Sequence, residues 1–366
     1  MLLQPLLDYR PALVNGQGIG RYVRELSRAL VGISGVEPAL FGPTWAVPSF
    51  ERSALGIEGA RLFRRRIPSK PLTSLLRGAG IGVERLFGGH ASLCHHTQYR
   101  RLPTRLPEVA TIHDLVFLDT DRFMASPTAE RMSAFARAAA EQCAAIITPT
   151  EVVADEVAER LDVPRERIFA THLGVDHVHR GAAERASAPS AAPYFLSAAR
   201  NETRKNLVTV LRAFEALGSD VRWKVAGTSG AGGEALDEAL RGSPARDRVD
   251  RLGHVDETRL RELVQGALAF VLVPLDEGFG LAPLEAMALG VSAISSNVPV
   301  VREVCGGGAV LVDPLDVDAL TAALERLAGD AEERARQAAL GSAHAARFTW
   351  ARTAEATLAA YRSVSP

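Results

Sequence analysis

Short apolar runs alternate with amphipathic segments along the whole chain. The run at 268–274 is continuous enough for a strand buried on both faces, whereas residues 19–30 repeat their apolar side chains with a helical period. This alternation predicts an α/β protein of two Rossmann-like domains, each a doubly wound parallel sheet, that face a central cleft. The expected strands are 2–9, 91–96, 109–114, 144–148, 168–175, 194–198, 221–226, 249–253, 268–274, 291–295 and 308–313.

The length of 366 residues also favours two domains, because a single hydrophobic core rarely extends that far. The periodic pattern stops at 177–192, where alanine, serine, glycine and proline dominate, as in interdomain linkers. We therefore expect an N-terminal domain at 1–176 and a C-terminal domain at 193–349.

Composition and charge narrow the classes of function. Hydrophobic residues make up 47% of the chain and charged residues 23%, which is typical of soluble globular proteins. The formal net charge of −1 gives no overall field toward nucleic acid, so we expect no nucleic-acid partner. The 3 cysteines are widely spaced and suit a reducing compartment, and no apolar run is long enough to span a membrane. The expected location is the cytoplasm.

Two carboxylates flank a glycine-containing turn that follows the apolar run 268–274. Glu277 lies in the turn, and Glu285 is expected in the first turn of the next helix, where the helix dipole favours an anion. Gly278 and Gly280 allow a ligand to approach the backbone, and a helix start offers N–H groups to a phosphate. The stretch therefore predicts a ligand site.

Two cations, Arg200 and Lys205, follow the expected strand 194–198 at the start of a helix that we place at 205–217. The carboxyl ends of parallel strands carry the ligand site of a doubly wound sheet. A cation pair at this position suits a diphosphate, and surface ion pairing is the alternative.

A glycine-rich loop with Gly18 and Gly20 leads into the helix at 19–30. Such a loop can cradle a phosphate or simply connect a strand tightly to a helix, and the residues leave both open. Its spacing fits neither the dinucleotide fingerprint nor a P-loop, so a dehydrogenase is the weakest alternative. The first strand is expected to run directly into Asp8-Tyr9-Arg10-Pro11 and an extended loop ahead of these glycines.

Histidines lie at the carboxyl ends of two expected strands of the first half. His113 is the better candidate for a ligand site, and a structural role is the alternative. His95 and His96 end another strand, but the spacing of these histidines is not typical of a metal site. The sequence Asp119-Thr120-Asp121 is formally a DxD metal motif. We expect no metal at either place.

Basic and apolar residues interleave at 59–89. Such a segment can lie on an anionic membrane surface, which makes peripheral contact with an inner membrane face one interpretation. A solvated protein face is the more common reason for a run of charges. The cations of the segment are Arg61, Arg64, Arg65, Arg66, Lys70, Arg77 and Arg85.

Three motifs of the second half resemble those of the retaining glycosyltransferases of the GT-B fold, specifically the family 4 group that builds bacterial polysaccharides. They are Arg200…Lys205-Asn206, Gly253-His254-Val255 and the phrase that runs from Glu277 to Ala288. Glu277 and Glu285 meet the E-x7-E motif of that group in full. The first half is similar through Gly18-Ile19-Gly20-Arg21-Tyr22 and His113-Asp114.

The resemblance implies roles for these residues. Arg200 and Lys205 would bind the diphosphate and stabilise it as it leaves, Glu285 would accept hydrogen bonds from the ribose, and Glu277 from the transferred sugar. His113 would lie beside the sugar, and the helix 350–366 would cross back onto the first domain. The other donor-binding residues implied are Gly18, Gly20, Gly227, Val255, Gly278, Phe279, Gly280 and Leu281.

The implied reaction moves a hexose from a nucleotide-diphosphate sugar to a hydroxyl of a glycan, glycolipid or small molecule, with retention and without cofactor or metal. The motif resembles that of mannosyl- and rhamnosyltransferases of O-antigen assembly, which favours GDP-mannose over UDP-glucose and dTDP-rhamnose. A nucleotide-sugar epimerase and a non-catalytic nucleotide-sugar-binding protein remain alternatives.

Overall fold

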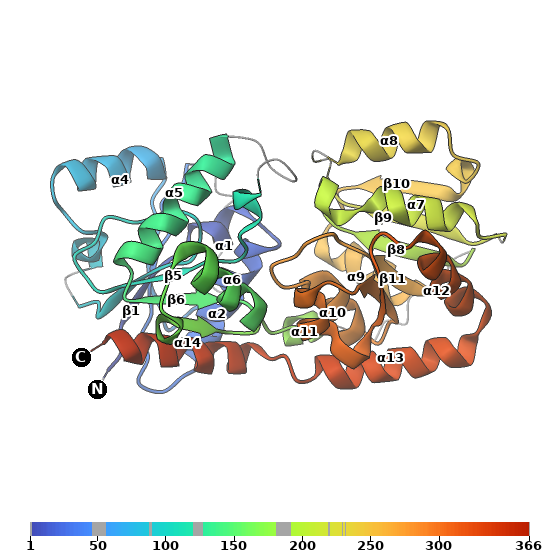
Figure 1. Cartoon of the computed structure of the whole chain (residues 1–366). Coiled ribbons are helices and arrows are strands. Elements are labelled where there is room, and N and C mark those ends of the chain that lie inside the picture. Colours follow the sequence, from blue (N-terminus) through green and yellow to red (C-terminus); the bar gives the residue numbers. More distant parts are fainter. Residues whose placement is uncertain are drawn as a thin grey trace. The chain divides into compact units, whose positions relative to one another are not determined.

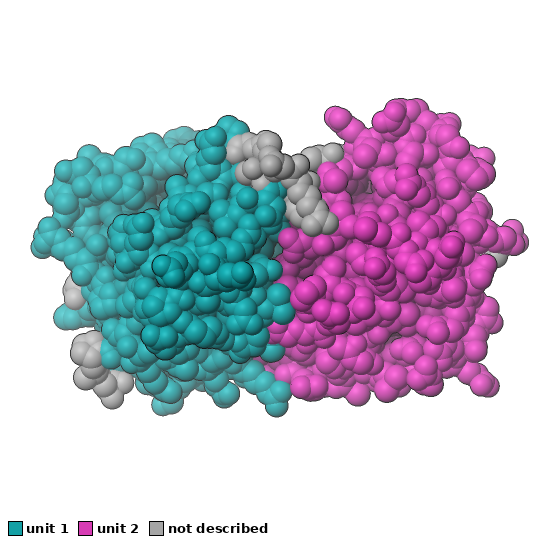
Figure 2. Space-filling model, in the orientation of Figure 1, with its two compact units in different colours: residues 1–174, 350–366 teal, residues 175–349 magenta. Residues whose placement is uncertain are grey.

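The computed structural model describes residues 2–45, 56–87, 90–119, 127–180, 192–218, 220–228, 230 and 232–365. The chain forms two compact units, which Figure 2 shows in separate colours. Unit 1 comprises residues 1–174 and 350–366, and unit 2 comprises residues 175–349.

Unit 1 is built on a parallel sheet of seven strands within the described residues, in the order β3-β2-β1-β4-β5-β6-β7. The strands β1, β2, β4, β5 and β6 are wholly buried, as is typical of a parallel sheet covered on both faces, whereas β3 at the edge is only partly buried. The strands are β1 (Pro5–Asp8), β2 (Ala39–Phe41), β3 (Arg61–Phe63), β4 (Leu93–His96), β5 (Glu108–Thr111), β6 (Ala145–Thr148) and β7 (Ile168–Ala170).

Helices connect the strands of unit 1, as parallel pairing requires. Thr150 caps one of them, α6, because its side chain accepts a hydrogen bond from the Val153 N–H at 3.2 Å. The helices are α1 (Arg10–Val14), α2 (Ile19–Val31), α4 (Ser69–Gly78), α5 (Pro127–Gln142), α6 (Glu151–Leu161) and α14 (Trp350–Val364), with 3-10 turns η1 (Val83–Phe87), η2 (Val116–Leu118) and η3 (Arg165–Arg167).

The last helix of the chain, α14, belongs to unit 1. It contacts α2, β6 and β7, and Figure 1 draws it in red beside these elements. Tyr361 is fully buried, and its hydroxyl lies 2.7 Å from Nδ1 of His95 in β4. The final helix thus completes the core of the N-terminal unit.

Unit 2 repeats the architecture with six parallel strands within the described residues, in the order β10-β9-β8-β11-β12-β13. Trp223, fully buried, anchors a core of aliphatic and aromatic side chains from the sheet and its helices. The strands are β8 (Tyr194–Ala198), β9 (Arg222–Ala226), β10 (Val249–Gly253), β11 (Ala269–Leu272), β12 (Ala293–Ser296) and β13 (Val310–Val312).

The helices of unit 2 pack on one another: α7 contacts α8 and α12, α12 contacts α13, and α10 contacts α11 and α13 (Figure 1). They are α7 (Leu207–Glu215), α8 (Gly233–Arg241), α9 (Glu257–Gln265), α10 (Leu281–Ala288), α11 (Pro299–Cys305), α12 (Val317–Gly329) and α13 (Ala331–Ala345). The 3-10 turns are η4 (Asp176–His179), η5 (Thr203–Lys205), η6 (Arg246–Arg248) and η7 (Gly306–Gly308).

Two expectations about the chain path are wrong. Residues after the first strand are not extended, because Arg10–Val14 forms α1 with Pro11 in its first turn. The start of the predicted linker, 177–180, lies in unit 2, where His177 and Val178 are buried. Residues 181–191 of that linker lie outside the described residues.

No helix among the described residues combines the length and the hydropathy that crossing a bilayer requires.

Candidate functional site

The strand order of unit 2 reverses direction between β8 and β11. In a doubly wound sheet, ligands bind at the carboxyl ends of the strands beside such a switch point. The chain leaves β8 into η5, which contains Arg204 and Lys205, and it leaves β11 toward Glu277. The predicted cationic and acidic segments therefore emerge from the two strands that flank the switch point.

Three side chains meet at this switch point. Lys205 Nζ contacts Oε1 of Glu277, while Arg204 Nη1 lies 3.0 Å from Oε2 of the same carboxylate. Arg204 Nη1 also donates to the Asp276 carbonyl at 3.2 Å. Glu277 is only 9% exposed, so these two ion pairs are largely shielded from water.

Arg200 is linked to these three side chains through Glu202. Its side chain is 68% exposed, and its Nε lies 3.8 Å from Glu202, whose other oxygen lies 3.1 Å from Arg204 Nε. Arg200 and Lys205 thus end a row of alternating charges that includes Glu202, Arg204 and Glu277. Sequence reasoning overlooked Arg204, although three cations in one turn after a strand were the signal.

The ionised form of Glu277 is favoured in this environment. Burial by itself raises the pKa of the carboxyl, but Lys205 and Arg204 outweigh burial and lower the pKa to about 2. Both oxygens of the carboxylate are engaged by cations. Glu277 is therefore a weak base with a fixed orientation.

Glu285 lies in the second turn of α10, not in the first turn as expected. The helix begins earlier, at Leu281, because Gly280 adopts a φ of 84° at the N-cap, a conformation that glycine accepts without strain. The Glu285 side chain is 19% exposed, and its Oε1 lies 3.0 Å from Nε2 of His177 in η4. Sequence reasoning missed His177, which lies 108 positions away.

The residues between Glu277 and Glu285 include the start of α10 and a buried aromatic side chain, Phe279. The first N–H groups of a helix lack intrahelical acceptors, and Leu281 opens α10. Phe279 is 5% exposed, and its ring packs edge-on against Phe348 at 6.2 Å. The side chain of Phe279 therefore anchors the turn, and a donor contact through the backbone of 278–281 stays a prediction.

Gly227 and Val255 lie farther from the switch point than the ion cluster. Gly227 directly follows β9, and its N–H donates to the carbonyl of Gly253 at 2.7 Å. Val255 follows β10, the edge strand of the sheet, and is partly buried against the core of unit 2.

The remaining predicted site residues, Gly18, Gly20 and His113, belong to unit 1, and their place beside the residues of unit 2 stays a prediction. Gly18 precedes α2. A Cβ atom on Gly20 would lie 2.0 Å from the Asn15 carbonyl oxygen, so close packing alone explains a glycine at position 20. His113 follows β5, and its ring packs edge-on at 5.0 Å against Tyr22 of α2.

Two family models match the chain in succession. The model described as Glycosyltransferase Family 4 matches residues 16–179, and the one described as Glycosyl transferases group 1 matches residues 182–342. The chain belongs to glycosyltransferase family 4. This result confirms the family predicted from the E-x7-E motif.

Curated relatives agree with this assignment. O-antigen chain mannosyltransferase B of Escherichia coli is 28% identical over 275 residues, which span 71% of this chain and 72% of the relative. The serotype-specific mannosyltransferase WbdA of Escherichia coli is 28% identical over 263 residues, which span 67% of this chain and 32% of that longer relative.

Solved structures share the fold over the full length. HepE of Anabaena, in complex with UDP and glucose, superposes with a TM-score of 0.77 at 15% identity, covering 99% of this chain and 100% of that one. Sucrose-phosphate synthase of Thermosynechococcus elongatus gives a TM-score of 0.74 at 21% identity, covering 99% and 98%. The predicted GT-B fold is thus confirmed.

The histidines of this family 4 chain separate into core and strand-end residues. His95 and His96 end β4 as expected, but both are fully buried in the core rather than placed toward a ligand. Burial lowers the pKa of His95 to about 3, so its ring is neutral in the core. His113 alone of the three follows its strand, and its Nε2 donates to the Thr97 carbonyl at 3.0 Å.

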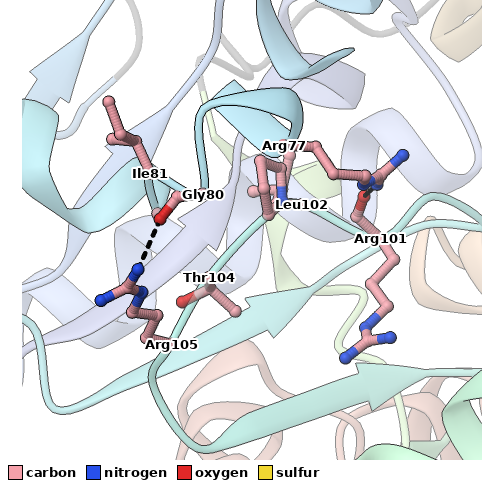
Figure 3. Close-up of a pocket in the computed structure, with 9 residues that line it drawn as sticks. Arg77, Gly80, Ile81, Arg101, Leu102, Thr104 and Arg105 are labelled. Carbon is pink, nitrogen blue, oxygen red and sulfur yellow. Dashed lines mark hydrogen bonds between the residues drawn. The ribbon is translucent and has the colours of Figure 1, made fainter. Parts of the chain in front are cut away.

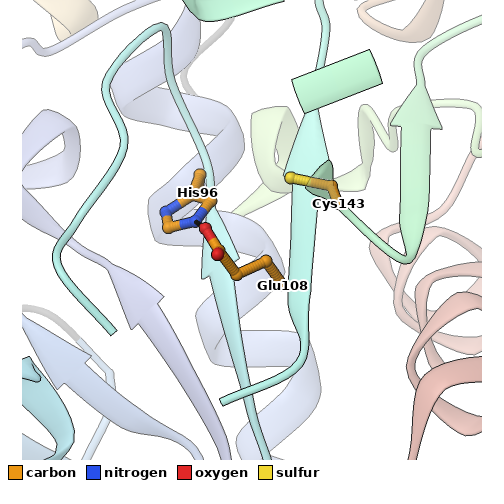
Figure 4. Close-up of side chains that lie close together, drawn as sticks. All are labelled: His96, Glu108 and Cys143. Atoms are coloured by element: carbon orange, nitrogen blue, oxygen red, sulfur yellow. Dashed lines mark hydrogen bonds and ion pairs between the residues drawn. The ribbon is translucent and has the colours of Figure 1, made fainter. Parts of the chain in front are cut away.

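A cluster of potential metal ligands, His96, Glu108 and Cys143, lies within unit 1 (Figure 4). Nδ1 of His96 accepts from the Leu102 N–H at 3.3 Å, so Nε2 carries the proton that it donates to Glu108 at 2.6 Å. Arg101 Nε lies 2.6 Å from the same carboxylate. Hydrogen bonds and an ion pair thus engage His96 and Glu108, and the absence of a metal at this cluster stays a prediction.

The DxD sequence is only partly described. Asp119 forms an ion pair with Arg160, with 2.7 Å between Oδ1 and Nη2, so its carboxylate is engaged by a cation. Thr120 and Asp121 lie outside the described residues. The expectation of no metal stays a prediction.

A pocket of about 300 Å³ lies in unit 1 between the end of α4 and the loop before β5, with Arg77, Arg101 and Arg105 in its lining. Figure 3 shows Arg105 turned toward Gly80, whose carbonyl it contacts at 2.8 Å. The loop enters β5 at its amino end, opposite the carboxyl ends that carry ligands in this fold. We therefore do not assign the donor to this pocket.

Proposed function

We propose that this glycosyltransferase moves a hexose from a nucleotide-diphosphate sugar to a hydroxyl, with retention of the anomeric configuration. The observation that carries the proposal is the meeting of Lys205 and Arg204 with Glu277 at the switch point between β8 and β11. Positive charge fixed at a strand end suits a diphosphate, and the neighbouring carboxylates suit sugar hydroxyls.

GDP-mannose is the proposed donor. The mannosyltransferase relatives support mannose. A HepE structure in complex with UDP-glucose keeps UDP-glucose as an alternative, and dTDP-rhamnose is another. The acceptor is a glycan, a glycolipid or a small molecule.

Each predicted site residue keeps its proposed role. Arg200 and Lys205 bind the diphosphate, Glu277 the transferred sugar and Glu285 the ribose. His113 lies beside the sugar. The proposed donor contacts through backbone are Gly18, Gly20, Gly227, Val255, Gly278, Phe279, Gly280 and Leu281.

The proposed chemistry is attack on the face that the diphosphate leaves. The bond between C1 and the diphosphate oxygen breaks, the acceptor oxygen bonds to C1, and the acceptor proton passes to the departing diphosphate. Double displacement would instead need a carboxylate nucleophile. Glu277 is unsuited to that role because cations hold both of its oxygens and its pKa is low, at about 2.

A donor screen followed by a release assay tests this proposal. Thermal unfolding with GDP-mannose, UDP-glucose or dTDP-rhamnose should show stabilisation by one donor, since a ligand at 100 times its Kd adds about 2.7 kcal/mol. Release of the nucleoside diphosphate should then require an acceptor. Conversion of the free nucleotide-sugar without acceptor would indicate an epimerase, and binding without any release would indicate a non-catalytic binding protein.

Transfer should proceed without a divalent metal. Lys205 and Arg204 supply positive charge at the switch point. In other enzymes a divalent metal supplies the charge that stabilises a leaving diphosphate. We expect the initial rate in excess EDTA to equal the rate in excess Mg²⁺. Abolition of transfer by EDTA, with recovery on adding Mg²⁺, would contradict the prediction and turn attention to Asp119-Thr120-Asp121.

The basic segment 59–89 supports a second proposal, peripheral contact with an anionic bilayer at the cytoplasmic side of a membrane. Leu75 in α4 is 70% exposed, and Ile67 before that helix is 38% exposed. Lys70 and Arg77 are exposed on the same helix, whereas the acidic Glu84 is buried and accepts from Thr104. Exposed apolar side chains flanked by cations are typical of an interfacial helix.

Sedimentation with vesicles tests the contact. The chain should bind mixed phosphatidylglycerol–phosphatidylcholine vesicles, but not pure phosphatidylcholine, and salt should weaken binding. Leu75→Ser should reduce binding several-fold through lost apolar burial. The matched control Leu340→Ser changes an exposed leucine of unit 2 and should bind normally. Equal binding by both variants would remove the proposal.

A further inference from the structure

The buried imidazole of His177 touches the second glutamate of the E-x7-E motif. His177 is 4% exposed, and its Nε2 lies 3.0 Å from Glu285 Oε1. An ionised carboxylate only accepts hydrogen bonds, so Nε2 carries the proton and donates it. The bond therefore constrains the direction in which the Glu285 carboxylate points.

The element that carries His177 is itself anchored on unit 2. Before η4, the Val175 N–H donates to the Phe348 carbonyl at 3.0 Å, and after it Arg261 Nη2 donates to the Arg180 carbonyl at 3.2 Å. Val178, the neighbour of His177, is 6% exposed. His177 is thus a donor on a fixed support, which is what holding a functional carboxylate in one geometry requires.

We propose that His177 is a positioning residue for the nucleotide, acting through Glu285 to set the preference for ribose over deoxyribose. The inference rests on the proposed function, in which Glu285 accepts hydrogen bonds from the ribose hydroxyls. A carboxylate held in advance binds those hydroxyls without a further ordering cost. A site built to bond a hydroxyl also rejects a ligand that lacks it, because its own polar group is then left without that partner.

Calorimetric titration of the full chain tests the inference with two matched nucleotide pairs, GDP against 2′-deoxy-GDP and UDP against 2′-deoxy-UDP. The wild type should bind the ribonucleotide of one pair more tightly. His177→Leu, which lacks the donor, should shrink this ratio by about tenfold, the worth of one hydrogen bond to a charged group. His177→Gln keeps an N–H donor and should restore most of the ratio.

The ratio separates positioning from a merely structural role. A loosened fold would weaken both nucleotides of a pair alike and leave their ratio unchanged, and that result with His177→Leu would overturn the inference. The matched control is His179→Leu, an exposed histidine of the same turn, which should keep the wild-type ratio. Loss of the ratio in His179→Leu as well would also overturn it, because the effect would not depend on the bond to Glu285.

Glu285→Gln distinguishes failure of this inference from failure of the proposed function. If Glu285→Gln loses the ratio while His177→Leu keeps it, Glu285 contacts the ribose without help from His177, and only the inference is wrong. If Glu285→Gln keeps the ratio, or if the wild type binds neither pair, the proposed role of Glu285 is wrong and the inference falls with it.

Discussion

Replacement of Lys205 by alanine is expected to lower turnover by about 10²–10³-fold, the usual effect of removing one group that stabilises charge in the transition state. Lys205 reaches the switch point of unit 2 from η5, and its ammonium group contacts Glu277 there. Negative charge develops on the diphosphate as the sugar leaves, so a fixed cation at this point acts mainly on the transition state. Arg200→Ala should lower turnover to a similar degree.

The comparison needs a control that removes a cation elsewhere in the same unit. Arg212 is exposed on α7, the helix that follows η5, and Arg212→Ala should transfer sugar at the wild-type rate. Initial rates at saturating donor and acceptor, with circular dichroism to verify folding, provide the measurement. Near-normal turnover by a folded Lys205→Ala or Arg200→Ala variant would remove the diphosphate assignment from that residue.

The parallel-sheet architecture was predictable because buried parallel strands leave a strong local signal. The strand expected at 194–198 and the observed β8 coincide, and those expected around 268–274 and 291–295 differ from β11 and β12 only at their ends. The helix α1 was missed, although Pro11 is a favoured residue in a first turn. Its short length left no periodicity to detect.

The site was predictable only as far as strand ends specify it. Glu277 and Lys205 follow neighbouring strands, so their meeting is implied by the strand order. Which other cation reaches Glu277 depends on the turn before α7. Asn206 adopts a φ of 59° there, and its side chain donates to the carbonyls of Val273 at 3.1 Å and Pro314 at 2.7 Å. These hydrogen bonds join residues that are far apart in the sequence, so no local sequence pattern predicts the conformation of the turn.

The bond between His177 and Glu285 shows the same limit. The segment 177–192, which contains His177, is rich in alanine and serine, and this composition predicts a linker. In the structure η4, which carries His177, packs on α10 of unit 2. His95 and His96 end β4 as expected, yet both are fully buried. The position of a residue at a strand end does not by itself show whether its side chain faces a core or a ligand.

Glu277→Gln is expected to destabilise unit 2 by about 3–5 kcal/mol, the usual cost of removing one partner from a buried ion pair. The neutral amide would leave Lys205 and Arg204, whose side chains are 13% and 18% exposed, without their shared counter-charge. Urea unfolding followed by Trp223 fluorescence reports on unit 2. Every protein in the comparison also carries Trp45→Phe and Trp350→Phe, because these two tryptophans of unit 1 would otherwise add to the fluorescence of Trp223.

The pH dependence of that unfolding provides a second, independent readout. The pKa of Glu277 is about 2 in the folded chain, below its usual value of 4.5, so folding favours the ionised form. Its contribution is fully present above pH 4.5 and is lost as pH falls toward 2, by about 1.4 kcal/mol per pH unit. In Glu277→Gln this share of the acid sensitivity of unit 2 should disappear.

Glu108→Gln is the matched control for acid sensitivity. Burial raises the pKa of Glu108, but hydrogen bonds from Arg101 and His96 outweigh burial and lower the pKa to about 2, the same value as for Glu277. Glu108 lies in unit 1. Its replacement should leave the Trp223 transition unchanged at every pH. If Glu277→Gln instead keeps the wild-type slope between pH 4.5 and 2, the cations do not hold the Glu277 carboxylate in the folded chain. The Glu277 carboxylate would then not be fixed in advance for the transferred sugar.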